Sequence, residues 1–109
     1  MHPEIEALAN TAKKAAELLN SVGKSHWSAW LARDAALLLR SDFRGVEELL
    51  SAFGGMGSIN DLVIHPMNGH NVQENDISKA NEQLQELLSE IPTKAKKLYY
   101  EELQANRRT

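Results

Sequence analysis

The apolar residues between positions 77 and 103 recur every three or four positions, and this spacing constrains the fold more than any other feature. The recurring residues are Ile77, Leu84, Leu87, Leu88, Ile91, Ala95, Leu98 and Leu103. Such spacing places side chains on one face of an α-helix. Pro92 lies within the pattern and cannot donate a hydrogen bond to the carbonyl of Leu88. We therefore expect a kink or a break at Pro92, with two collinear or gently bent helical pieces.

Three earlier segments have the same periodicity and predict helices over about residues 3–22, 26–39 and 42–53. The first seam contains Ile5, Leu8, Ala12, Ala15, Leu19 and Val22; the second contains Trp27, Leu31, Ala35 and Leu38; the third contains Phe43, Val46, Leu49, Leu50 and Phe53. Pro3 suits a first helical turn, where its missing N–H costs nothing. Gly23 can take the left-handed conformation that ends a helix. Ser25 is a candidate cap for the second helix, and Ser41 or Asp42 for the third.

Two residues on these helices carry more specific expectations. Gly45 falls in the first turn of the third helix, where it could permit close approach by another helix. Asp34 lies at the edge of the second seam, and we expect a rim carboxylate paired with Arg33 or a lysine.

The overall pattern predicts an all-α fold, a compact bundle of four or five helices in one domain spanning residues 1–109. An irregular Gly-rich connection is expected at about residues 54–75. The run "DLVIH" is the one short apolar segment that could pair as a strand.

Composition excludes several classes of function. The chain has no cysteine, so disulfides, thiolate metal sites and cysteine catalysis are ruled out. A net charge of −3 argues against nucleic-acid binding as the main task. We see no secretory signal and no apolar run long enough to cross a membrane. The sequence therefore predicts a cytoplasmic protein with no membrane or nucleic-acid partner and no cofactor.

Charge is unevenly distributed along the chain. Residues 92–109 hold 5 basic and 2 acidic side chains, whereas residues 1–91 hold 7 basic and 13 acidic ones. The cations favour the C-terminal end of a helix dipole, or alternatively form a docking surface for an acidic partner.

The segment "FGGMGSINDLVI" contains three of the six glycines within four residues. Its spacing does not match the G-x-G-x-x-G fingerprint, and it follows a predicted helix instead of a strand. We interpret it as a helix stop at Gly54, a turn through Gly55 and Gly57, and a new helix capped by Ser58. Within this turn Met56 either folds back as an anchor or projects toward a partner.

The loop that follows holds the densest polar cluster, His65 and His70 with Asp61, Asn71, Glu74 and Asp76 nearby. Two imidazoles with carboxylates could bind a divalent metal. The H-x4-H spacing is not a recognised zinc pattern, however, and the intervening "PMNG" is typical of a turn. We expect a hydrated loop without a metal, with His65 and His70 as candidate contacts for a ligand or partner.

The string "DFRGVEELLSAFGGMGSINDLVI", followed by "NEQLQELLSEI", resembles a family of short uncharacterised bacterial proteins. The shared signature is GGMGS, one hydrophobic residue, then NDL. Here it comprises Gly54, Gly55, Met56, Gly57, Ser58, Ile59, Asn60, Asp61 and Leu62. The resemblance implies a domain of unknown function, and by analogy an immunity- or antitoxin-like role.

Two functions remain open from the sequence. The first is a non-enzymatic protein-interaction module that contacts a protein partner through the Met56 turn and the loop up to His70, with no catalytic residue. The second is a small enzyme or ligand-binding protein that uses the Gly54–Ser58 turn as an anion site, with Asp61 and His65 as acid–base groups. The leucine seams also predict a symmetric homodimer through the long C-terminal helix.

Overall fold

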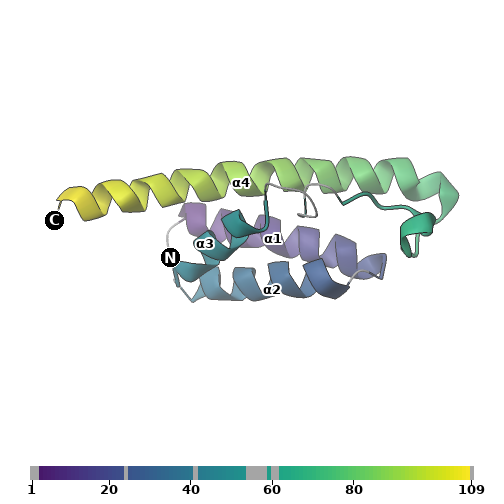
Figure 1. Ribbon diagram of the computed structural model, residues 1–109, viewed down its shortest axis with the longest axis horizontal. Helices are drawn as coiled ribbons and strands as arrows, with labels where there is room; N and C mark the ends of the chain where they lie inside the picture. The colour runs from purple at the N-terminus through teal and green to yellow at the C-terminus, as the bar shows by residue number, and fades with distance from the viewer. Residues whose placement is uncertain (1–2, 24, 41, 54–58, 60–61, 109) are drawn as a thin grey trace.

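The protein is an all-α bundle (Figure 1). The structure, a computed structural model, describes residues 3–23, 25–40, 42–53, 59 and 62–108. The elements in these ranges are α1 (Pro3–Ser21), α2 (Ser25–Leu39), α3 (Arg44–Ser51), two short 3₁₀ helices η2 (Pro66–Asn68) and η3 (Glu74–Asp76), and α4 (Ile77–Arg108). No strand occurs in the described ranges, so "LVIH" from position 62 onward is not a strand. Nor is any helix there long and apolar enough to span a bilayer.

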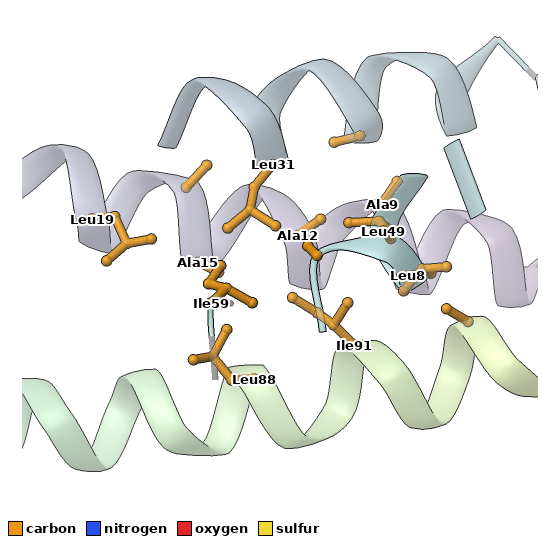
Figure 2. Packing of buried hydrophobic residues seen from close by; sticks show 14 of the residues in the cluster. Leu8, Ala9, Ala12, Ala15, Leu19, Leu31, Leu49, Ile59, Leu88 and Ile91 are labelled. Atoms are coloured by element: carbon orange, nitrogen blue, oxygen red, sulfur yellow. The ribbon is translucent and has the colours of Figure 1, made fainter. Parts of the chain in front are cut away.

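Helix α1 lies between α2 and α4 and supplies the centre of the core (Figure 2). Its buried face is wider than the predicted seam, because Ala9, Thr11 and Ala16 are buried as well. Small side chains on two adjoining faces let α1 pack closely against two helices at once. The helix stops as predicted, with Gly23 in the left-handed region at a φ of 83°.

Helix α4 continues through Pro92 as one element, so of the two expected alternatives, a kink or a break, the break does not occur. Figure 1 shows it running along the whole body and past the other helices at its C-terminal end. Leu84, Leu88, Ile91 and Ala95 are buried on both sides of the proline. Burial of one continuous apolar face outweighs the single backbone hydrogen bond that proline removes. The molecule measures 54 × 26 × 20 Å as a result.

Helices α2 and α3 approach closely at Gly45, as the sequence predicted. A Cβ atom added to Gly45 would lie 2.9 Å from the backbone oxygen of Asp34 and 3.0 Å from Cγ of Leu38. Only glycine permits this approach without displacing the backbone of α2. The start of α3 differs from the prediction, because its N-cap is Phe43, which makes no side-chain cap hydrogen bond. The Asp42 carboxylate, one residue earlier, accepts a hydrogen bond from the Arg44 amide at 3.0 Å, and Ser41 lies outside the described residues.

Candidate functional site

The connection between α3 and α4 is held to the body by the side-chain amide of Asn81. Oδ1 of Asn81 accepts from the backbone N–H of Ile64 at 2.8 Å. Its Nδ2 donates to the backbone oxygens of Ile64 at 2.9 Å and Ile77 at 3.0 Å. The amide thus satisfies both backbone groups of Ile64, whose side chain is fully buried. A second backbone hydrogen bond, from Asn71 to the oxygen of Val22 at 2.8 Å, fixes the far end of the connection to the α1–α2 turn.

Between these two attachments the chain forms a tight turn around η2. The backbone N–H of His65 donates to Nδ1 of His70 at 3.0 Å, and Nδ1 of His65 accepts from the backbone N–H of Met67 at 3.1 Å. Gly69 closes the turn at a φ of 81°, in the left-handed region. His65 therefore acts as the cap of η2.

This arrangement turns two apolar side chains to solvent. Met67 is 89% exposed and Val63 is 51% exposed. The hydrogen bonds of the turn leave the flexible Met67 side chain in solvent instead of folded back onto the core. We call this turn, residues 63–69, the Met67 turn.

The predicted site residues fall into two groups. Gly54, Gly55, Met56, Gly57, Ser58, Asn60 and Asp61 lie outside the described residues. Of the two histidines, His65 is half-buried and His70 is only 4% exposed, so His70 offers little surface to a partner. The turn brings His65 and His70 together, but the Nδ1 atom of each ring accepts a backbone hydrogen bond within the turn.

Removing the Asn81 amide is expected to release the connection. We expect Asn81→Ala to lower the free energy of unfolding by about 2 kcal/mol, because buried backbone groups of Ile64 lose their partner. Hydrogen exchange measured at the Ile64 amide should accelerate more than exchange at the α1 amides. Gln85→Ala, an exposed position one turn further along α4, is the matched control. Unchanged exchange at Ile64 in Asn81→Ala would show that other contacts hold the connection.

A second unusual site lies where α2 meets α3. Asp34 is fully buried, so the prediction of a rim carboxylate is wrong. Within the described residues its carboxyl oxygens make no hydrogen bond of 3.5 Å or less, and neither does the buried Nε1 of Trp30. Arg33 pairs with Glu48 instead, from Nη2 to Oε2 at 3.2 Å, and stacks 5.3 Å from the centre of the Trp30 ring. Asp34 follows Leu31 by three residues and precedes Leu38 by four, which places it on the inward face once α3 covers it.

The pKa values of Asp34 and of its neighbour Glu48 shift in opposite directions. Burial raises the pKa of Asp34 to about 8, and the neighbouring Glu48 carboxylate adds to the effect. The pKa of Glu48 is lowered, first by the Asp34 carboxyl group beside it and then by the positive charge of Arg33, which both favour the ionised form. At neutral pH Asp34 is therefore mostly a neutral carboxylic acid beside an ionised Glu48. Because the Asp34 side chain is fully buried, its raised pKa links stability to pH.

Metal coordination finds no support from the part of the chain that the structure describes. No three histidine, aspartate or glutamate side chains there are arranged to hold an ion. The alternative acid–base site rests on His65 and on residues outside the described ranges. Because Nδ1 of His65 accepts a backbone hydrogen bond, only its Nε2 atom would be open to such chemistry.

Part of the chain matches the model of an uncharacterised domain. Residues 20–73 match the model of a family described as Domain of unknown function (DUF6966). No curated protein and no solved structure gave a significant match. The GGMGS signature and the bacterial origin implied by the resemblance stay predictions.

The DUF6966 match covers a specific part of the fold. It begins at the end of α1 and includes α2, α3 and the connection, but stops before η3 and α4. Both the Asp34–Glu48 pair and the Met67 turn lie inside it, whereas Asn81 and the outward face of α4 lie outside.

Sequence reasoning missed Met67, Asn81 and the burial of Asp34. One signal was present for Asn81, a polar residue between Ile77 and Leu84 on the seam that faces the core. Met67 carried no comparable signal, because its exposure depends on how distant residues hold the turn.

Proposed function

We propose that this protein is a non-enzymatic protein-interaction module whose contact surface is the Met67 turn. The observation that carries the proposal is the 89% exposure of Met67 on a turn held from both ends. A preorganised turn loses little conformational entropy on binding. Methionine adds a flexible, polarizable side chain suited to filling an apolar pocket on a partner.

The chemistry of the turn favours binding over catalysis. The Nδ1 atoms of His65 and His70 both accept backbone hydrogen bonds within the turn, and the side chain of His70 is buried. Exposed Glu74 and Asp76 follow within η3 and give the neighbourhood negative charge. The partner we infer offers an apolar pocket bordered by basic side chains. The family resemblance suggests that such a partner is a toxin or similar protein that this chain neutralises.

A comparison of two surface variants tests the proposal. Met67→Lys should reduce capture of the specific partner from extracts of the native host, because the lysine removes the apolar anchor and places its charge in the pocket. Ala36→Lys, a change at an exposed apolar position on α2, should capture the partner as wild type does.

Titration with the purified partner makes the test quantitative. We expect Met67→Lys to raise the dissociation constant about tenfold or more, as truncation of a binding hot spot does. Equal affinity of Met67→Lys and wild type would overturn the proposal.

A further inference from the structure

The face of α4 that points away from the other helices carries a shallow hollow in its N-terminal half. Among the described residues, those that line it are Ser78, Asn81, Glu82, Gln85, Glu86 and Ser89. Their spacing places them on one stripe of the helix. All except Asn81 are exposed, and the hollow has a volume of about 720 Å³. Glu82 and Glu86 make this half of the stripe acidic.

The same stripe continues into the C-terminal half of α4 with the opposite character. Thr93, Lys96, Tyr100 and Leu103 follow Ser89 at steps of three and four residues. Tyr100 is 61% exposed and Leu103 is 37% exposed. This half therefore presents a positive charge and two large apolar side chains, the complement of the acidic hollow.

We propose that two copies of the chain associate through this stripe as an antiparallel, two-fold symmetric dimer. The symmetry axis passes at the level of Ile91, between Ser89 and Thr93. Glu86 of one copy then faces Lys96 of the second copy, each about 7.5 Å along the helix from the axis. Glu82 faces Tyr100 of the second copy at about 13.5 Å from the axis.

Self-complementarity is what selects a second copy as the occupant. The described lining residues of the hollow lie on the same stripe of α4 as Lys96, Tyr100 and Leu103. A two-fold axis therefore makes both contacts twice without any other chain. Ser89 and Thr93 are small enough to let the helices cross closely at the axis. The Tyr100 ring fits the hollow, where serine and glutamine side chains can bond its hydroxyl group. The leucine seam is not the interface, since Leu84 and Leu88 are buried in the bundle.

Charge reversal measured by sedimentation equilibrium tests the contact between Glu86 and Lys96. We expect Glu86→Lys or Lys96→Glu alone to raise the dimer dissociation constant about tenfold, because each turns two attractions into repulsions. The double variant Glu86→Lys with Lys96→Glu should return to near the wild-type constant. Glu47→Lys, an exposed position on α3, is the control and should leave the dimer unchanged.

Cysteine cross-linking tests the antiparallel register, and the chain offers a background without cysteine. A mixture of Glu82→Cys and Tyr100→Cys proteins should form a mixed disulfide on mild oxidation, whereas Tyr100→Cys alone should not cross-link efficiently. A monomeric wild-type protein, a double variant no tighter than the single ones, or efficient cross-linking of Tyr100→Cys to itself would overturn the proposal. Met67→Lys should leave the dimer intact, so failure of this proposal and failure of the proposed function are distinguishable.

Discussion

Replacing Gly45 with alanine is expected to lower the free energy of unfolding by about 1–2 kcal/mol. The new Cβ atom would lie 2.9 Å from the backbone oxygen of Asp34, so α2 and α3 must separate. Overpacking of this kind costs about 1–3 kcal/mol. It outweighs the stabilisation of up to about 1 kcal/mol that alanine gives over glycine within a helix. Urea denaturation monitored by circular dichroism measures the change.

Substitutions at Gly23 separate close packing from backbone conformation. An added Cβ atom at Gly23 meets nothing within 4 Å, but its φ of 83° is unfavourable for alanine. Asparagine tolerates this conformation, so we expect Gly23→Asn to be more stable than Gly23→Ala. At Gly45 the order should reverse, because asparagine is larger than alanine. A Gly45→Ala protein as stable as wild type would show that the two helices can part without loss.

The second large effect concerns Asp34 and pH. The folded protein holds a proton on Asp34 up to about pH 8, whereas the unfolded chain releases it near pH 4. Between these values the folded state binds more protons, so wild-type stability should fall as pH rises. One proton gives a slope of up to about 1.4 kcal/mol per pH unit. Asp34→Asn cannot ionise, so it should remove this slope and be more stable than wild type at pH 8.

Denaturation at a series of pH values with two variants checks the sign. Asp42→Asn is the contrasting control, because Arg44 lowers the pKa of Asp42 to about 2. The stability that Asp42 contributes is present above pH 4 and is lost as pH falls toward 2, opposite to Asp34. Glu48 and Arg33, the charged neighbours of Asp34, remain in both variants. Identical pH profiles for wild type and Asp34→Asn would mean that Asp34 titrates normally in the folded protein.

Those expectations depend on which side chains the fold buries, and the sequence predicted this unevenly. Helix periodicity correctly predicted the all-α class and the approximate bounds of the four helices. It also predicted the stop at Gly23 and the close approach at Gly45. These features are local, since a three-to-four spacing or a missing Cβ acts within a few residues of itself.

Tertiary packing decided the remaining features. Pro92 was expected to kink or break α4, and burial of the face on both sides keeps the helix in one piece. Asp34 was expected at a rim, but α3 closes over it. Asn81 fixes Ile64 from 17 residues away in the sequence, and Met67 is exposed because that contact holds its turn.

The sequence by itself determined which segments are helical and which face of each is apolar, because both depend on neighbours along the chain. Only the tertiary structure decided where polar side chains ended up: Asp34 inside, Asn81 against a distant backbone, and the acidic and basic halves of one α4 stripe in solvent. The physical reason is that the free-energy cost of burying a charge or an amide depends on which distant group lies next to it. Helical periodicity carries no information about that group.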